Sequence, residues 1–199
     1  ENNIHAGVKY LRFIVDHYFD DPAIDEVNRT LFAFASYNAG PNRIRRLRAK
    51  AAEQGYDPNV WFRNVEILAA EEIGREIEGG ADGIVVGHGT DVMGHTAAVL
   101  SFMVQDTPVP SGIVGSQRSS DRPSSDAARN LIHAVRAAGQ GDIAEVQICM
   151  FGPTSDRYGL LHRGTRCRKM HSSYRSTFRT IGDVPLSVVD RDGFKTINP

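Results

Sequence analysis

Residues 81–91 read Ala-Asp-Gly-Ile-Val-Val-Gly-His-Gly-Thr-Asp. The run from Gly83 to Val86 is short, continuous and apolar, which is typical of a strand buried in a parallel sheet. His88-Gly89-Thr90-Asp91 follows it directly, and ligands of open α/β sheets bind beyond the carboxyl ends of the strands. We therefore expect an α/β sheet whose first strand ends in a polar site.

The sequence after this stretch alternates between helical and strand patterns. Helices are expected at residues 93–104 and 125–138, where apolar side chains recur at helical spacing. Residues 109–115 and 145–151 read as two further buried strands. Strands that alternate with helices in this way favour a parallel sheet.

The sequence before this stretch reads as helices only. Apolar residues at helical spacing cover residues 4–18, 27–40, 41–55 and 64–78. Gly40 suits the position just after a helix, and Pro41 suits the first turn of the next one. Gly79-Gly80 then separates this helical part from the first strand.

The composition is that of an ordinary globular protein. Of the 199 residues, 41% are apolar and 24% are charged, and the net charge is −1. The apolar runs are too short for a membrane-spanning helix, so no membrane span is expected. Cys149 and Cys167 have neither a disulfide framework nor metal-ligand spacing. We expect both thiols to be reduced and structural, and we expect no metal and no cofactor.

Positive charge is concentrated late in the chain. Residues 157–182 contain no acidic residue. Their basic residues are Arg157, Arg163, Arg166, Arg168, Lys169, Arg175 and Arg179. Such a run could face an anionic ligand or RNA phosphates. Composition alone favours the alternative, a basic edge that is simply solvated.

Residues 36–40, Ser-Tyr-Asn-Ala-Gly, carry a first resemblance, together with residues 3–11 upstream and residues 57–66 downstream. These segments resemble the soluble lytic transglycosylases over residues 1 to about 76. The resemblance implies an all-α lysozyme-like fragment in which Tyr37 and Asn38 line a cleft for peptidoglycan. On their residue types alone, Tyr37 and Asn38 could equally well do no more than end a helix.

The general acid of that family is missing from the sequence. In the family a catalytic Glu lies upstream in a Glu-Ser motif, and a Gly-Leu-Met-Gln segment follows; neither motif occurs in these residues. Glycosidic cleavage needs an acid placed against the leaving oxygen. We therefore expect the fragment to bind glycan at most.

A second resemblance covers residues from about 77 to 199. It rests on residues 81–91, on residues 115–126 (Gly-Ser-Gln-Arg-Ser-Ser-Asp-Arg-Pro-Ser-Ser-Asp) and on residues 162–171 (His-Arg-Gly-Thr-Arg-Cys-Arg-Lys-Met-His). These segments are similar to the asparaginase and glutaminase family, above all to the branch formed by the ammonia-releasing subunit of archaeal glutamyl-tRNA(Gln) amidotransferases. Together the two resemblances imply an α+β chain: an all-α lysozyme-like fragment, then an α/β parallel-sheet asparaginase-like fragment.

The second resemblance also implies site residues and partners. It implies that Thr90 and Lys169 form a nucleophile–base pair and that Asp91 holds the amino group of the substrate. The expected substrate-binding residues are His88, Gly89, Ser116 and Gln117. The implied substrate is glutamine or asparagine, and the implied location is the cytoplasm. The implied partners are another amidotransferase subunit and tRNA. The resemblance also suggests a homodimer. A dominant transglycosylase part would instead place the protein in the periplasm or cell envelope.

The pattern of the second family is incomplete as well. The family uses a second Thr, in a Thr-Gly-Gly-Thr turn on an N-terminal strand, and no such turn precedes Thr90 in the sequence. We expect both sites to be incomplete and amide turnover to lie at or near background. The join between the two resemblances is expected within a helix, around residues 71–80.

Overall fold

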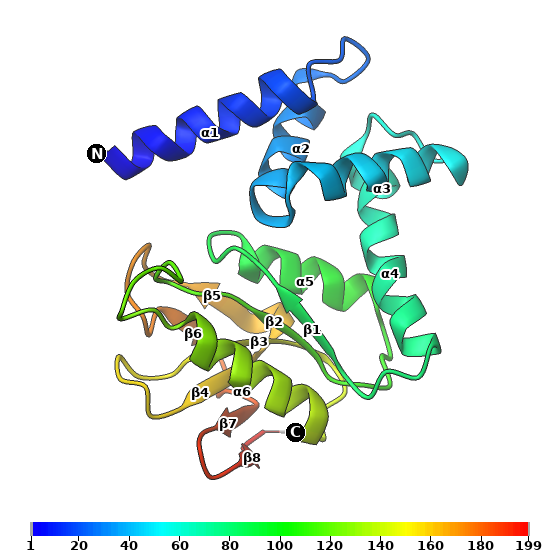
Figure 1. Ribbon diagram of the computed structural model, residues 1–199. Coiled ribbons are helices and arrows are strands. Elements are labelled where there is room, and N and C mark those ends of the chain that lie inside the picture. The colour runs from blue at the N-terminus through cyan, green and yellow to red at the C-terminus, as the bar shows by residue number, and fades with distance from the viewer. Residues whose placement is uncertain (1, 199) are drawn as a thin grey trace. The chain divides into compact units, whose positions relative to one another are not determined.

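The computed structural model describes residues 2–198, except for the side chains of residues 2–4, 6, 38–39 and 69–70. The chain divides into two compact units, Glu1–Glu72 and Ile73–Pro199. Helices occupy the first part of the chain and strands begin only at Ile84 (Figure 1). The expected change from helices to strands after Glu78 is therefore confirmed.

The first unit is built from helices. They are α1 (Asn2–Tyr18), α2 (Glu26–Ala39), α3 (Pro41–Glu53), the single turn η1 (Trp61–Val65) and the beginning of α4 (Glu66–Glu78). The side chain of Asp25 caps α2 by accepting a 2.7 Å hydrogen bond from the backbone N–H of Asn28. Pro41 begins α3, and Phe19, Phe32 and Leu68 are among the fully buried side chains of the core of this unit.

The second unit contains a six-stranded sheet in the order β1-β2-β3-β4-β7-β8. Its strands are β1 (Ile84–Gly87), β2 (Ser111–Val114), β3 (Val146–Phe151), β4 (Gly159–Arg163), β7 (Ser187–Val189) and β8 (Phe194–Thr196). The first three are parallel, as expected, and β4, β7 and β8 are antiparallel. The expectation of a parallel sheet is therefore wrong for the last three strands, which join neighbouring strands without a crossover helix.

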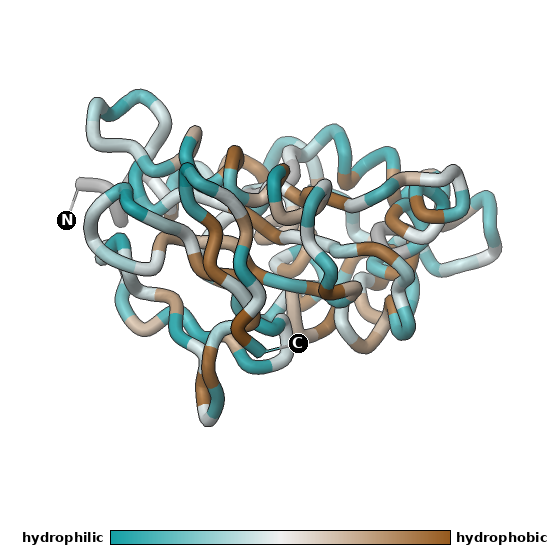
Figure 2. Tube along the Cα trace, turned by 90° about the horizontal axis from the view of Figure 1, so that it is seen from below, coloured by the Kyte–Doolittle hydropathy of each residue, from teal (hydrophilic) through white to brown (hydrophobic). Residues whose placement is uncertain are grey.

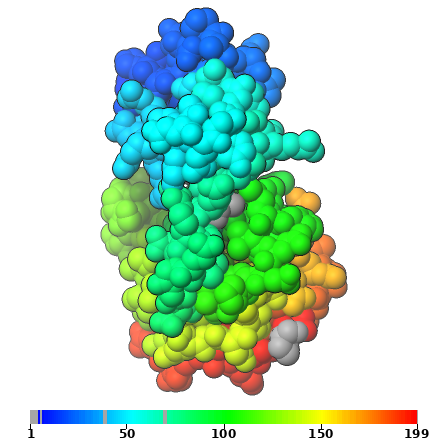
Figure 3. Space-filling model, turned by 90° about the vertical axis from the view of Figure 1, so that its right-hand side faces the viewer, coloured from blue at the N-terminus to red at the C-terminus, as the bar shows by residue number. Residues whose placement is uncertain are grey.

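Two helices and a small second sheet complete this unit. The helices are α5 (Met93–Met103) and α6 (Ala127–Gln140), and both contact β3, whose residues are all buried. The second sheet pairs β5 (Cys167–Lys169) with β6 (Phe178–Thr180), after the short turn η2 (Gly164–Arg166). Part of α5 stays at the surface (green in Figure 3), where Phe102 is 68% exposed.

Apolar side chains fill the interior of the second unit. Figure 2 shows outer loops mostly in teal and apolar stretches in brown between them. The two cysteines, Cys149 and Cys167, belong to this interior and are free, as expected. Burial raises the pKa of each thiol to about 12, so both remain protonated at neutral pH. Among the helices of residues 2–198, none combines the length and the apolar character needed to cross a bilayer.

A buried carboxylate organises the loop after β2. Asp126 is fully buried and accepts hydrogen bonds from the backbone N–H groups of Gln117, at 3.0 Å, and Arg118, at 2.9 Å. Asn130 donates to the same carboxylate at 2.9 Å and to the carbonyl of Gly115 at 3.0 Å. Since a buried charge needs several hydrogen bonds, Asp126 and this loop stabilise each other.

Replacing this carboxylate should destabilise the second unit. Asp126→Ala takes the acceptor away from three donors, so we expect the free energy of unfolding to fall by roughly 3 kcal/mol. Urea denaturation followed by far-ultraviolet circular dichroism measures the change. Asp192→Ala removes an exposed carboxylate from the same unit and should change stability by less than about 0.5 kcal/mol. Equal effects of the two substitutions would contradict this role for Asp126.

Stability should also fall in mild acid because of a buried histidine. His162 in β4 is almost completely buried, and this burial, aided by the charge of Arg179, lowers its pKa to about 4. The unfolded state, with an ordinary histidine pKa near 6.5, binds the proton first, so stability is lost as pH falls from about 6.5 to about 4. Between about pH 7.5 and 4.5 the loss from His162 is roughly 2.5 kcal/mol.

Denaturation at both pH values checks this effect. His162→Asn should reduce the pH-dependent loss by the contribution of His162, whereas His5→Asn, at an exposed position, should leave the loss unchanged. The same loss in the His162→Asn variant would show that other groups cause it.

Candidate functional site

Three side chains that are far apart in the sequence meet beyond the end of β1. Thr90 and Asp91 lie between β1 and α5, and Lys169 is the last residue of β5. The Lys169 Nζ donates hydrogen bonds to Thr90 Oγ1 at 2.9 Å and to Asp91 Oδ1 at 2.7 Å. The predicted proximity of these three residues is therefore confirmed, although Thr90 and Lys169 are separated by 79 positions.

Small residues allow the backbone segments to approach closely enough for this contact. A Cβ on Gly94, in the first turn of α5, would lie 2.8 Å from the carbonyl oxygen of Cys167 in β5. A Cβ on Gly115 would lie 2.3 Å from the carbonyl oxygen of His88 and 3.2 Å from the methyl group of Thr90. The separations from the two carbonyl oxygens are too short for a side chain, so only glycine fits at these two positions.

The three polar groups differ greatly in exposure. The side chain of Lys169 is 10% exposed, whereas that of Asp91 is 85% exposed. Asp91 therefore presents a carboxylate to solvent that can accept hydrogen bonds from an ammonium group. Thr90 offers a hydroxyl within reach of the largely buried amine. A hydroxyl beside an amine is the arrangement that nucleophilic catalysis uses when the amine acts as the base.

His88 and Gly89 connect the end of β1 to Thr90. The backbone N–H of His88 donates to the carbonyl of Val114 at 2.8 Å, which continues the pairing of β1 with β2. The Nδ1 of the imidazole contacts the carbonyl oxygen of Gly89. Burial lowers the pKa of His88, against the opposite effect of that hydrogen bond, so the ring is neutral at pH 7.

Ser116 and Gln117 follow β2 and lie at the same edge of the sheet, because β1 and β2 are parallel. Both residues are partly buried. The Gln117 side-chain amide donates to the carbonyl of Tyr174 at 3.0 Å and contacts that of Ser172 at 3.5 Å. Gln117 therefore links the loop after β2 to the loop between β5 and β6.

Tyr37 and Asn38 lie in α2, in the first unit. Tyr37 is 47% exposed and packs against Tyr10, with ring centroids 5.7 Å apart. The side chain of Asn38 is outside the described residues. The expected contact of these two residues with a glycan stays a prediction.

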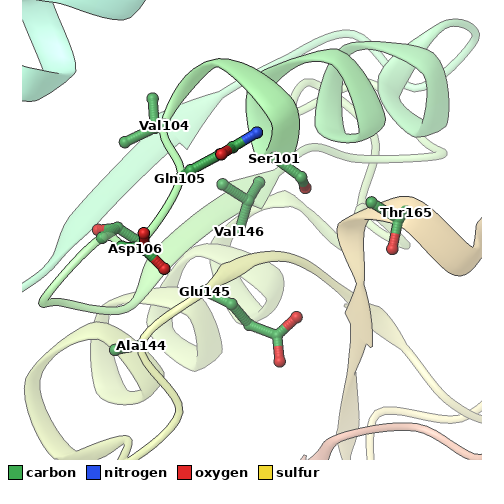
Figure 4. Close-up of a pocket in the computed structure, with 9 residues that line it drawn as sticks. Ser101, Val104, Gln105, Asp106, Ala144, Glu145, Val146 and Thr165 are labelled. Atoms are coloured by element: carbon green, nitrogen blue, oxygen red, sulfur yellow. The ribbon is translucent and has the colours of Figure 1, made fainter.

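A surface pocket that the sequence did not predict lies at the other end of the sheet. The pocket has a volume of about 320 Å³ and includes Asp106, Glu145 and Thr165 in its lining; Asp106 and Thr165 lie on opposite sides of it in Figure 4. Glu145 precedes β3, so the pocket adjoins the starting edge of the parallel strands, away from Thr90. The carboxylate of Glu145 is already paired with Arg163 at 2.8 Å, so Glu145 itself has little free charge for a ligand. Within residues 2–198, no three His, Cys, Asp or Glu side chains come together as metal ligands.

The sequence of the chain is similar to those of known proteins. The family described as "Asparaginase, N-terminal" matches residues 30–199. A glutamyl-tRNA(Gln) amidotransferase subunit of Methanobrevibacter smithii is 45% identical over 196 residues, which cover 98% of this chain and 42% of that protein. The corresponding glutamyl-tRNA(Gln) amidotransferase subunit of Thermococcus kodakarensis is 57% identical over 136 residues, covering 68% of this chain and 30% of that protein.

Solved structures agree on the fold. The thermostable L-asparaginase of Thermococcus kodakarensis is 30% identical, with a TM-score of 0.56 over 65% of this chain and 38% of its own. A probable cytoplasmic L-asparaginase of Campylobacter jejuni, 24% identical, shows the same fold with a TM-score of 0.59 over 67% of this chain and 40% of its own.

These matches also bear on the helical part of the chain. The chain spans less than half the length of these relatives. The match to the Methanobrevibacter protein extends over nearly all of this chain, including its helical part. The family match begins at residue 30, inside α2, and so includes helices whose sequence resembles that of transglycosylases. None of these relatives supports a transglycosylase segment, and the family match and the two amidotransferase subunits support one assignment. The chain belongs to the asparaginase family.

Proposed function

We propose that the cluster of Thr90, Asp91 and Lys169 is the catalytic end of a site that hydrolyses the side-chain amide of glutamine or asparagine. The observation that carries the proposal is the pair of hydrogen bonds from the Lys169 Nζ to Thr90 Oγ1, at 2.9 Å, and to Asp91 Oδ1, at 2.7 Å. A nucleophile, a base and a carboxylate thus lie at one strand end. Membership of the asparaginase family supports the same chemistry.

The groups can divide the reaction between them. Lys169 in its amine form accepts the proton of Thr90 as Oγ1 attacks the amide carbon. The resulting ammonium returns a proton to the departing nitrogen, so that ammonia leaves and an ester on Thr90 remains. Water then hydrolyses this ester, with Lys169 again taking and returning the proton. Asp91, exposed at the mouth of the cluster, holds the ammonium group of the substrate.

The names of the relatives suggest the fate of the ammonia. They describe a subunit of an amidotransferase that acts on glutamyl-tRNA(Gln). We therefore propose that a complete site of this type releases ammonia from glutamine in the cytoplasm, for a partner subunit that amidates Glu-tRNA(Gln). A homodimer remains a prediction from the family resemblance.

Binding of glutamine tests the site independently of turnover. L-glutamine and L-asparagine should shift the NMR amide signals of residues 89–92, whereas L-norleucine, which lacks the amide, should shift them much less. Asp91→Asn removes the charge that holds the substrate ammonium and should weaken binding about tenfold, since a charge-assisted hydrogen bond contributes about 1.5–3 kcal/mol. Asp192→Asn makes the same change at an exposed position and should leave binding unaltered. Shifts that are absent, or equal in the Asp91→Asn variant, would contradict the proposal.

Turnover of the 199-residue chain should lie at or near background, because the sequence before Thr90 contains no Thr-Gly-Gly-Thr turn with a second Thr nucleophile. Ammonia release at high protein concentration measures it, with Thr90→Ala and Lys169→Ala as comparisons. A clear rate that both substitutions abolish would contradict the low rate and would make Thr90 a working nucleophile. A rate that neither changes would come from a contaminating enzyme.

An exposed aromatic group favours a second candidate function, the binding of peptidoglycan by the first unit. Tyr10 contacts both Tyr37 and Phe13, with ring centroids 5.7 Å and 6.3 Å apart, and all three rings are exposed. Flat exposed rings can stack on sugars. The sequence contains no Glu-Ser motif, so this unit would bind glycan without cleaving it.

Sedimentation with insoluble peptidoglycan tests this second candidate. Binding by this surface should fall several-fold in Tyr37→Ala and should be unchanged in Tyr56→Ala, a half-buried tyrosine of the same unit. Anhydro-muropeptides released by the purified chain would show a cleavage activity that we do not expect. Equal sedimentation with and without peptidoglycan would eliminate the candidate.

A further inference from the structure

The small sheet that positions Lys169 carries two arginines on its other face. Arg168 in β5 lies directly opposite Arg179 in β6. Cys167 and Phe178, their neighbours along the strands, are buried, whereas both arginines are exposed. Like charges directly opposite each other destabilise an antiparallel pair. The two arginines therefore weaken the small sheet unless an anion lies between them.

The acidic residues of this unit do not neutralise these two arginines. Three other arginines of residues 157–182 are paired: Arg163 with Glu145 at 2.8 Å, Arg166 with Asp183 at 3.9 Å and Arg175 with Asp156 at 2.6 Å. Arg157, which precedes β4, donates instead to the hydroxyl of Ser155. Within residues 2–198, no carboxylate lies within ion-pair distance of Arg168 or Arg179.

The groups next to the two arginines carry no negative charge. The Nη1 of Arg168 lies 3.3 Å from the Nε2 of His95, in the first turn of α5, and Arg179 donates to the carbonyl of its neighbour Phe178. The first turn of α5 has no acidic residue and no side-chain cap, so the positive end of the helix dipole is not neutralised there. Asp91, just before this helix, is already held by Lys169 at 2.7 Å.

Exposed rings lie in the loop that joins the two strands. Tyr174 is 51% exposed and contacts His171, with ring centroids 6.2 Å apart. The loop is fixed in place, because Gln117 donates to the carbonyl of Tyr174 at 3.0 Å and Thr177 donates to that of His171 at 2.9 Å. Proteins that bind single-stranded nucleic acid combine basic side chains on the backbone with aromatic rings on the bases. The small sheet supplies the arginines and its connecting loop supplies the exposed ring.

We propose that the outer face of β5 and β6 binds the phosphate backbone of an RNA strand, with Arg168 and Arg179 on the phosphates and Tyr174 against a base. The planar guanidinium groups suit this role, since each can donate two parallel hydrogen bonds to one phosphate. The proposal rests on the proposed function for the choice of RNA, and on the two arginines without a carboxylate partner for the site. Because side chains alternate along β5, RNA on Arg168 leaves Lys169 facing Thr90.

Binding of a labelled single-stranded RNA of about 12 nucleotides, a length within the range that one single-strand-binding fold covers, tests the proposal. Fluorescence anisotropy at several salt concentrations measures it. Arg168→Gln combined with Arg179→Gln should weaken binding at least tenfold at low salt. The slope of log affinity against log salt should become shallower by about 1.4, which is about 0.7 for each lost phosphate contact. Tyr174→Ala should weaken binding about fivefold or more without changing the slope.

The matched control is Arg191→Gln combined with Lys195→Gln, which removes the same charge from exposed positions of the same unit and should change affinity by less than twofold. A loss as large in this control would show unspecific attraction and overturn the proposal. So would equal competition by polyglutamate, which would indicate an acidic protein, or by inorganic phosphate at the same phosphate concentration, which would indicate a free anion. Circular dichroism verifies that each variant is folded.

The outcome can be separated from that of the proposed function. The NMR shifts caused by glutamine at residues 89–92 should be the same in the native chain and in the Arg168→Gln, Arg179→Gln variant. RNA binding that depends on the two arginines, without NMR shifts caused by glutamine, would support the RNA-binding surface and reject the amide site. Glutamine shifts with RNA binding that is unaffected by both arginine substitutions would reject the surface alone.

Discussion

The close approach of β5 to the first turn of α5 is the constraint on which the site depends. Gly94 leaves room for the carbonyl of Cys167, and this contact brings Lys169 within 2.9 Å of Thr90. A methyl group at Gly94 would collide with backbone atoms, which cannot move aside as a side chain can. Backbone packing therefore brings the segments that carry Thr90 and Lys169 within hydrogen-bond reach of each other.

The parts of the fold that were predictable are those with a long and regular pattern. Buried apolar runs and helical spacing indicated β1, α5, β2, α6 and β3 in their correct order, and the helices before them. The antiparallel strands were not recognisable, because β7 and β8 have three residues each and β4 contains a single apolar pair, Leu160-Leu161. Patterns this short do not distinguish a strand from a loop.

The site was predictable only in part. Thr90 and Asp91 could be placed from their position after a buried strand, whereas Lys169 could be placed only by family resemblance, since no local pattern links residues 79 positions apart. The role of Asp126 was missed because its expected place at the start of the helix over residues 125–138 gives no sign of burial, yet it is fully buried and holds the backbone of Gln117 and Arg118. A resemblance to transglycosylases drew attention to Tyr37, which lies in the other unit.

The alternation of side chains along β5 places two kinds of group on opposite faces of one short strand. Lys169 turns toward Thr90, and Arg168, one residue earlier, turns to the opposite face beside His95. A strand of three residues cannot shift by one position without exchanging these faces. Such a shift would bury the guanidinium group of Arg168 and expose the side chain of Lys169. Phe178 and Cys167, buried on the inner face, oppose such a shift because it would bring both into solvent. The packing that fixes Lys169 therefore also holds the outer arginines in place.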